Sequence, residues 1–457
     1  MSKKLGKQTY KFNNLISISD TRAIVGPMEG EGPLRSYFNE IIKDDLLGQN
    51  SYEKAEHQMC LKNIFAVMEK NNLKQSDIDI YIGGDLLNQI ITTNLTARDL
   101  KIPYWGVYNA CSTFVEALQT ASTLLDGDFI DTAIISATSH FSTAERQYRY
   151  PLELGTQSPP TAQRTVTGSG CVLLNKNVTN KPIITHMTIG KVMDFEQNDP
   201  NDMGSAMAIA ACDTIITHLE DIDKSPQDYD LIITGDLGIV GYNIAKDFLR
   251  KKGVNIENIY KDCGMLIYDT KNQDVVSGGS GAGCSASVFC SFLYDKLLKK
   301  ELNNILLVAT GALLSPVSTG QKENIPCIAH AVINIKGVFM EYLNVFITGG
   351  ILCLIAQIIM DNTKLVSGQI LVIYIVMGVI LTAIGLYEPI VQFGKAGATV
   401  PLTGFGYSLV KGTILQVKQD GIIGILTGPL TATAGGITAA IIFGYFFAFI
   451  FSPKTKK

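Results

Sequence analysis

Charged residues are scarce in the last part of this 457-residue chain. Residues 340–457 contain no arginine and hold only 11 of the 38 basic and 42 acidic residues. The chain also has no basic excess, because its formal net charge is −4 at pH 7. A nucleic-acid-binding protein is generally basic, so the composition argues against a nucleic-acid partner. The uneven charge indicates a soluble part joined to a part that resides in a membrane.

Metal-binding motifs are missing as well. The nine cysteines are scattered, and neither a CxxC pair nor a Cys/His cluster has the spacing of metal ligands. We therefore expect no metal site and no other cofactor. The N-terminus lacks an apolar signal run, since Met1 to Lys4 and the residues after them are polar. We expect the first part to be cytosolic, with reduced thiols.

The first part contains an internal repeat. Three of its segments recur later in the same order: 79–86 as 230–237, 110–112 as 283–285, and 134–138 as 307–310. In each copy, short aliphatic strands alternate with helices of 3.6-residue period, which predicts an α/β fold with a mostly parallel, buried sheet. The expected units are residues 1–178 and 179–335, followed by a membrane part at 340–457.

A cysteine lies where a predicted strand meets a predicted helix. Residues 102–110 resemble a strand and residues 114–125 an amphipathic helix, so Cys111 falls at a buried helix N-terminus. Free N–H groups and the helix dipole favour an anion there. Either Cys111 is a thiolate of low pKa, or an anionic ligand binds at this position. A small buried cysteine that fills a tight turn explains the pattern equally well.

The duplicated unit with Asn-Ala-Cys-Ser at residues 109–112 resembles the thiolase/ketoacyl-synthase superfamily. That resemblance implies a layered αβαβα fold and a nucleophilic cysteine assisted by His/His or His/Asn from the second half. Longer stretches resemble the stage V sporulation protein AD family: TVTGSG at 165–170, DMGSAM at 202–207, ATGALLSP at 309–316, IPCIAH at 325–330, and Ser139-His140 with TAERQ at 143–147. This family implies binding of dipicolinic acid, pyridine-2,6-dicarboxylate, and its uptake into the developing spore.

The two loops that should supply the catalytic base contain no histidine: they read TGDL at 234–237 and SGGSGAG at 277–283. We expect His186 and His218 on the surface and His330 near the domain's end. Only His140 can reach the pocket, and a structural role explains it at least as well. Acyl transfer needs a base and an oxyanion site, so the sequence favours a binding protein over an enzyme. The alternatives are a membrane-anchored acyltransferase or ketoacyl-synthase-like enzyme that uses Cys111, and a structural dock with a vestigial pocket.

Six residues are candidate contacts of the substrate: Cys111, Ser112, Thr113, His140, Asp236 and Ser280. Asp236 is unfavourable for a bare dianion and fits better if dipicolinate arrives as its calcium chelate, because calcium prefers carboxylate oxygen. Arg146, Arg149 and Arg164 bracket a long loop. They either clamp a carboxylate or tie the loop to its own domain or to a second copy, as in the homodimers of thiolase-like proteins.

Three uncharged runs lie in the last part, at residues 342–360, 368–387 and 421–451. Since about 20 apolar residues span a bilayer, the first two predict transmembrane helices. The third, interrupted by glycines and a proline, predicts a tilted helix plus a broken piece. The glycine-rich residues 394–406 either belong to a permeation path, which Glu388 and Lys395 would face, or form an interfacial loop packed by small residues.

Residues 340–457 resemble the stage V sporulation protein AE family in MDNTKL at 360–365, GLYEP at 385–389 and GATVP at 397–401. The resemblance implies other stage V sporulation A membrane proteins as partners and the spore inner membrane as location. The two families normally form separate chains, so a genuine fusion and a lost stop codon both stay open. The basic residues at 454–457 favour a cytosolic C-terminus. Since the soluble part is also expected to be cytosolic, both ends lie on one side, which requires an even number of crossings, most simply four; three crossings would contradict this arrangement.

Overall fold

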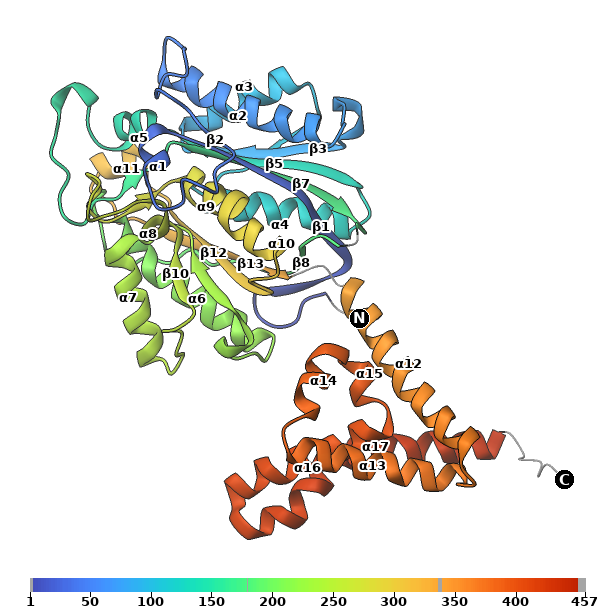
Figure 1. The fold of residues 1–457 in the computed structure, drawn as a ribbon. Helices are drawn as coiled ribbons and strands as arrows, with labels where there is room; N and C mark the ends of the chain where they lie inside the picture. Colours follow the sequence, from blue (N-terminus) through green and yellow to red (C-terminus); the bar gives the residue numbers. More distant parts are fainter. Residues whose placement is uncertain (1–2, 179, 336–338, 451–457) are drawn as a thin grey trace. The chain divides into compact units, whose positions relative to one another are not determined.

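The computed structural model describes residues 3–178, 180–335 and 339–450 (Figure 1). The chain divides into two compact units, Met1–Gly337 and Val338–Lys457. The first unit is an α/β domain, and the described residues of the second unit are almost entirely helical. The predicted division at residues 178 and 179 stays a prediction, because residue 179 lies outside the described residues.

The strands of the first unit form an 11-stranded sheet with the order β10-β9-β12-β13-β8-β1-β7-β5-β3-β4, in which β2 pairs only with β1. β1 and β8 are neighbours at the centre of this order. Counting outward from β1 gives β7, β5, β3 and β4, and counting outward from β8 gives β13, β12, β9 and β10, so the two halves correspond strand by strand. The strands are β1 Thr9–Val25, β2 Glu40–Ile41, β3 Ile80–Gly84, β4 Tyr104–Gly106, β5 Thr132–Ser139, β7 Gly168–Lys176, β8 Ile183–Thr188, β9 Leu231–Thr234, β10 Tyr260–Asp262, β12 Asn304–Ala312 and β13 Cys327–Ile335. The repeated segments contain β3 and β9, then β5 and β12, so the topology confirms the predicted duplication.

The prediction of a mostly parallel sheet is wrong. β3 pairs parallel with β4 and β5, and β9 pairs parallel with β10 and β12. The central pairings, which involve β1, β7, β8 and β13, are antiparallel. Strands buried on both faces produce continuous aliphatic runs. Such runs indicate burial but carry no information on strand direction.

Two helices lie between the halves of the sheet, as Figure 1 shows: α4 (Thr113–Asp126) and α9 (Ala282–Val288). Helix α4 contacts strands of both halves, including β5 and β12. The outer faces are covered by α2 (Tyr52–Lys70) with α3 (Ile91–Leu100), and by α6 (Met203–Asp221) with α7 (Gly238–Lys251). This is the αβαβα layering that the resemblance implied.

Shorter elements complete the first unit. The helices are α1 Pro27–Gly30, α5 Phe141–Tyr148, α8 Cys263–Ile267, α10 Tyr294–Leu298 and α11 Pro316–Gly320, with single 3-10 turns at Gln75–Asp77, Asn88–Ile90, Leu152–Leu154 and Pro226–Asp228 and a π-helical turn at Phe289–Leu293. The strands β6 (Arg164–Thr165) and β11 (Gly279–Ser280) pair with each other in parallel. This pair brings the loop after α5 next to the glycine-rich loop before α9.

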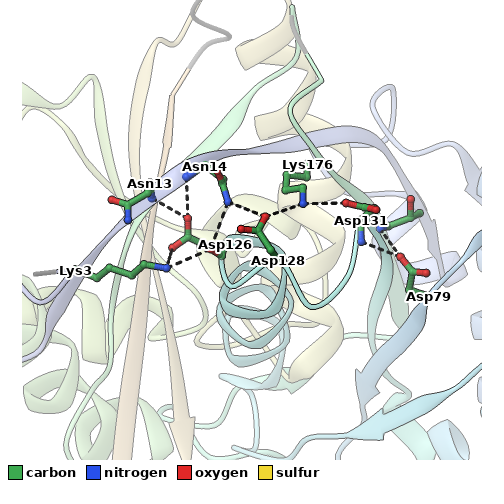
Figure 2. Close-up of polar contacts among 9 residues, drawn as sticks. Lys3, Asn13, Asn14, Asp79, Asp126, Asp128, Asp131 and Lys176 are labelled. Carbon is green, nitrogen blue, oxygen red and sulfur yellow. Dashed lines mark hydrogen bonds and ion pairs between the residues drawn. The ribbon is translucent and has the colours of Figure 1, made fainter. Parts of the chain in front are cut away.

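The C-terminal end of α4 is fixed to β1 by a carboxylate. Asp126 is buried, and its Oδ1 accepts hydrogen bonds from the backbone N–H groups of Asn13 and Asn14, at 2.7 and 2.8 Å. Its Oδ2 pairs with Lys3 at 2.7 Å, and Figure 2 shows this cluster continuing through Asp128 to Lys176. The two N–H groups lie where the register of β1 and β8 shifts. Asp126 therefore supplies hydrogen-bond acceptors to an irregular stretch of β1. It also fixes the C-terminal end of α4, and Cys111 lies just ahead of the other end of this helix.

The second unit contains six helices within the described residues: α12 Phe339–Asn362, α13 Ser367–Ala383, α14 Tyr387–Gly394, α15 Ala396–Thr399, α16 Leu402–Asp420 and α17 Gly424–Ile450, with a 3-10 turn at Gly421–Ile423. By length and apolar composition, Asn344–Asn362 qualifies to span a membrane. So does the bent pair Gly421–Gly435 and Ile437–Ile450, which meet at 43°. Ser367–Ala383 is apolar but shorter.

The first candidate span agrees with the predicted run at 342–360. The second helix is shorter than the predicted run at 368–387, and the third, predicted at 421–451, is bent. The number of crossings stays a prediction. The basic tail on which the predicted orientation rests lies outside the described residues.

Small residues bring the helices of the second unit into close contact. A Cβ on Gly378 would lie 2.1 Å from the carbonyl oxygen of Thr403, and one on Gly406 would lie 2.3 Å from that of Ile375, so α13 and α16 touch through their backbones. The hydroxyl of Tyr387 donates to the carbonyl oxygen of Ala398 at 2.8 Å. The glycines of the glycine-rich segment are therefore buried against neighbouring helices, whereas Lys395 and Val400 of the same segment are exposed. Its predicted role in permeation is still a prediction.

Candidate functional site

Cys111 lies in a tight turn ahead of α4, as predicted. Ala110 has a φ of 50°, in the left-handed region. The Thr113 hydroxyl accepts from the N–H of Asn109 at 3.0 Å and donates to the carbonyl oxygen of Ala110 at 2.6 Å. The turn therefore closes on itself, and it places the Cys111 side chain, only 6% exposed, at the end of a cavity.

Asp236 is the charged group next to the Cys111 sulfur. It follows β9 and is buried, and its Oδ1 accepts from the Thr310 hydroxyl at 2.5 Å. Its Oδ2 accepts from the N–H of Gly281 at 3.2 Å, and the carboxylate also accepts from the Cys111 thiol. Burial raises the pKa of Asp236 to about 6, although these hydrogen bonds act in the opposite direction.

The thiol itself is not activated. Burial and then the negative charge of Asp236 raise the pKa of Cys111 well above its ordinary value, while the N–H of Gly281 and the charge of Arg149 oppose this only in part. A buried thiol beside a carboxylate stays protonated at neutral pH, and the thiolate is the nucleophilic form. Of the two functional interpretations of Cys111, the structure therefore gives no support to the low-pKa thiolate.

The cavity at Cys111 is narrow. Its volume is about 30 Å³, and Tyr108, Tyr148, Arg149, Met203 and Ser280 are among its lining residues. A site needs about 10–15 Å³ to hold a water molecule, and an engineered cavity of about 150 Å³ holds benzene. The cavity therefore has room for water but not for an aromatic ring unless its walls move.

Two tyrosines separate this cavity from an outer groove. The hydroxyls of Tyr108 and Tyr148 lie 3.2 Å apart, and the Tyr148 hydroxyl donates to the carbonyl oxygen of Leu86. Both tyrosines also line the groove, which has a volume of about 470 Å³ and is bounded by residues 87–90 and 313–315. Movement of the tyrosine pair would connect the groove with Cys111.

A second, polar cavity lies on the other side of Arg149. It has a volume of about 480 Å³ and is called the arginine cavity below. It is lined by Phe141, Glu145, Arg149, residues 155–158, Ala162, Gln163, Arg164 and residues 274–276. Arg149 lines both this cavity and the one at Cys111.

The structure brings together only part of the predicted site. Cys111 and Ser280 line the narrow cavity, and Asp236 lies behind the sulfur. The buried hydroxyl of Ser112 has no hydrogen-bond partner, but Ser112 is not a lining residue. Thr113 is engaged in the turn. The role of these residues in binding a substrate stays a prediction.

His140 lies outside the cavity and has structural partners. Its Nδ1 accepts from the N–H of Ser142 at 3.1 Å, which caps α5, and its Nε2 lies 2.8 Å from the carbonyl oxygen of Asp45. Burial lowers the pKa of His140. These contacts fit the structural alternative that the sequence left open.

The other histidines are also engaged elsewhere. His218 is buried rather than on the surface as predicted, because its two ring nitrogens contact the hydroxyls of Thr188 and Tyr229 at 2.6 and 2.8 Å. His330 contacts Asn109 and the N–H of Gly190 at 3.2 and 3.1 Å, and burial lowers its pKa to about 4. Within the described residues, therefore, a carboxyl group and not an imidazole accompanies the sulfur.

The equivalent cysteine of the second half has a different environment. Cys284 is the third residue of α9, is fully buried, and donates to the carbonyl oxygen of Gly235 at an S–O distance of 3.3 Å. It is not among the residues that line the cavity at Cys111. Only one of the two repeated cysteines therefore faces that cavity.

Together, these features define a thiolase-like protein that has a cysteine ahead of its central helix and an aspartate in place of the expected base, joined to a helical unit of membrane-protein composition. Residues 6–335 match the family model of stage V sporulation protein AD (SpoVAD). The chain belongs to this family. Residues 341–450 match the SpoVAC/SpoVAEB family of sporulation membrane proteins, which confirms the predicted joining of two sporulation families in one chain.

Individual relatives agree with this assignment. Stage V sporulation protein AD of Bacillus subtilis is 47% identical over 331 residues, which cover 72% of this chain and 97% of that protein. Stage V sporulation protein AC of the same organism is 31% identical over 113 residues, which cover 23% of this chain and 73% of that protein. The C-terminal unit thus belongs to a family of sporulation membrane proteins.

Two solved structures are similar to this chain at low sequence identity. OleA of Xanthomonas campestris is 14% identical with a TM-score of 0.45, over 71% of this chain and 99% of that chain. The 3-oxoacyl-[acyl-carrier-protein] synthase III of Aquifex aeolicus is 12% identical with a TM-score of 0.44, over 73% of this chain and all of that chain (100%).

Proposed function

We propose that this protein binds dipicolinate, as the free dianion or as its calcium chelate, and serves its uptake into the developing spore. The soluble unit captures the ligand on the cytosolic side, as a homodimer. The helical unit anchors it in the spore inner membrane beside other stage V sporulation A membrane proteins. The family assignment supports a role in the spore SpoVA system, and the finer statement rests on the site.

The pairing of Cys111 with Asp236 is the observation that carries the proposal. An acyl-transferring enzyme needs a base that takes the proton from the thiol. Burial and the negative charge of Asp236 instead raise the pKa of the thiol and so disfavour the thiolate. This arrangement supports binding without covalent chemistry at the sulfur.

The alternative function, an acyltransferase that uses Cys111, keeps one favourable feature, because the cysteine retains its place ahead of a central helix. A single experiment separates the two functions. The full-length chain in detergent is titrated calorimetrically with dipicolinate, with and without calcium, and is incubated in parallel with acyl-CoA thioesters. The proposal expects saturable binding and no acyl adduct by mass spectrometry. Stable acylation of Cys111 or turnover would establish the enzyme instead.

The calcium part of the proposal has its own test. Asp236 is the only acidic residue among the six candidate contacts, and calcium prefers carboxylate oxygen. If the chelate is the ligand, calcium strengthens dipicolinate binding to the wild-type chain and has a smaller effect on Asp236→Asn. Equal affinity under all four conditions would rule out the chelate and leave free dipicolinate as the ligand.

A further inference from the structure

Arg149 has an unusual position between two cavities. It follows α5, its side chain is 7% exposed, and its Nη1 pairs with Glu145 Oε2 at 3.0 Å. Its Nη2 is buried and has no hydrogen-bond partner. A buried guanidinium N–H without an acceptor is costly, so the structure leaves a strong donor unused at the wall that the two cavities share.

A second arginine in the arginine cavity also has an unused donor. The guanidinium of Arg164 stacks on the ring of Phe141, with its carbon 3.8 Å from the ring centroid. Its buried Nε has no partner. Gln163 adds an unpartnered acceptor, because its Nε2 donates to the carbonyl oxygens of Asp236 and Gly279 while its Oε1 accepts nothing. The polar groups around this cavity are therefore incompletely satisfied.

The size and charge of the arginine cavity define the ligand class. Its volume of about 480 Å³ lies in the range of small-molecule sites, whereas the cavity at Cys111 holds only about 30 Å³. Two arginines face it, together with the carboxylates of Glu145, which pairs with Arg149, and of the exposed Asp274. Arginine binds carboxylates through parallel N–H groups, and two arginines suit a planar molecule with two carboxylates.

We propose that Arg149 is a carboxylate-binding residue and that a planar dicarboxylate binds in the arginine cavity, with Arg164 as its second cationic contact, rather than directly over Cys111. The identification of that dicarboxylate with dipicolinate rests on the proposed function. Arg149 then links the two cavities, since it contacts the ligand on one side and lies near the Cys111 sulfur on the other.

The test compares arginine variants of the full-length chain in detergent. Dipicolinate is titrated into the wild type, Arg149→Gln, Arg164→Gln and the control Arg146→Gln. Arg146 is an exposed arginine within α5, where it pairs with Glu53, and it does not line the arginine cavity. Loss of a charge-assisted hydrogen bond weakens binding by about 10- to 100-fold. We expect this loss for Arg149 and Arg164, and less than about a twofold change for Arg146. Picolinate, which has one carboxylate, should bind the wild type more weakly and respond to fewer of the substitutions.

The outcomes distinguish this inference from the proposed function. If the wild type does not bind dipicolinate, the proposed function fails, and the assignment of dipicolinate to this cavity fails with it. If the wild type binds and the arginine variants bind equally well, while Cys111→Ala or Asp236→Asn weakens binding, only the inference fails. Because Arg149→Gln leaves Glu145 unpaired, the double variant Glu145→Gln/Arg149→Gln is measured as well. Unchanged circular dichroism and melting temperature show that any loss concerns the ligand and not folding.

Discussion

The most informative single substitution is Asp236→Asn, because the structure predicts that it stabilises the protein in a pH-dependent manner. The pKa of Asp236 is about 6 in the folded chain instead of its ordinary 3.8. The neutral form is therefore favoured by folding. The stability that this group contributes is fully present below about pH 4 and is lost as the pH rises through 6. At about 1.4 kcal/mol for each factor of ten, the loss is roughly 3 kcal/mol at pH 7.5.

Asparagine removes that loss and can keep the main contacts. Its carbonyl oxygen can accept from Gly281, and its amide can donate to the hydroxyl of Thr310, which rotates to accept. About 1 kcal/mol of this loss is already present at pH 4.5. We therefore expect the free energy of unfolding of Asp236→Asn, relative to wild type, to be higher at pH 7.5 than at pH 4.5 by up to roughly 2 kcal/mol. The gain also includes relief of Asp262, whose raised pKa is due mainly to burial and in part to the charge of Asp236.

The assay uses the single tryptophan of the chain. Trp105 lies in β4, so its fluorescence during denaturant unfolding reports on the first unit alone. Asp128→Asn is the control, because this fully exposed carboxylate pairs with Lys176 and its pKa is lowered rather than raised. A gain for Asp236→Asn that is equal at both pH values, or absent at pH 7.5, would refute the argument that burial dominates the electrostatics of this site.

Four further outcomes are expected. Iodoacetamide should leave Cys111 largely unmodified at pH 7.5, because burial and the neighbouring carboxylate raise its pKa; rapid alkylation seen by mass spectrometry would contradict this. Tyr148→Ala should speed the alkylation of Cys111 by iodoacetamide, since it opens the wall between the groove and the cavity at Cys111, and an unchanged labelling rate would mean that the two tyrosines do not control access to the sulfur. Asp126→Ala should lower the free energy of unfolding by about 2–4 kcal/mol because two backbone N–H groups lose their acceptor, and a loss below that range in denaturant unfolding would show that water replaces the carboxylate. Gly378→Ala should lower the melting temperature of the helical unit, whereas Gly350→Ala, whose Cβ meets no atom within 4 Å, should not; equal effects would argue against close packing of α13 and α16.

The fold could be predicted largely because the chain repeats itself. The copies at 79–86 and 230–237 are strands at equivalent places in the sheet, and the helix after Cys111 begins within one residue of its predicted start. Strand direction could not be predicted, because it depends on how the connections cross the sheet and leaves no mark in hydrophobic periodicity.

The candidate site was only partly predictable, because some of its features depend on contacts between segments that are distant in sequence. The position of Cys111 follows from local sequence, since a strand, a tight turn and a helix determine it. Arg149 was predicted only as one of three arginines around a long loop, and its ion pair with Glu145, at the end of α5, was not predicted. Which N–H of Arg149 is left without an acceptor depends on packing against loops distant in sequence. The surface position predicted for His218 failed for a similar reason. Its side chain contacts Thr188 of β8 and Tyr229, and these contacts depend on tertiary packing that the local sequence pattern does not show.

The repeated cysteines give the molecule a built-in reference. Cys284 occupies the place of Cys111 in the second half, but it is sealed against the carbonyl oxygen of Gly235 instead of facing a cavity. Both thiols share one chain, one preparation and one global unfolding rate, so the ratio of their labelling rates cancels those common factors. That ratio measures how often the cavity at Cys111 opens to solvent or ligand while the rest of the domain stays folded.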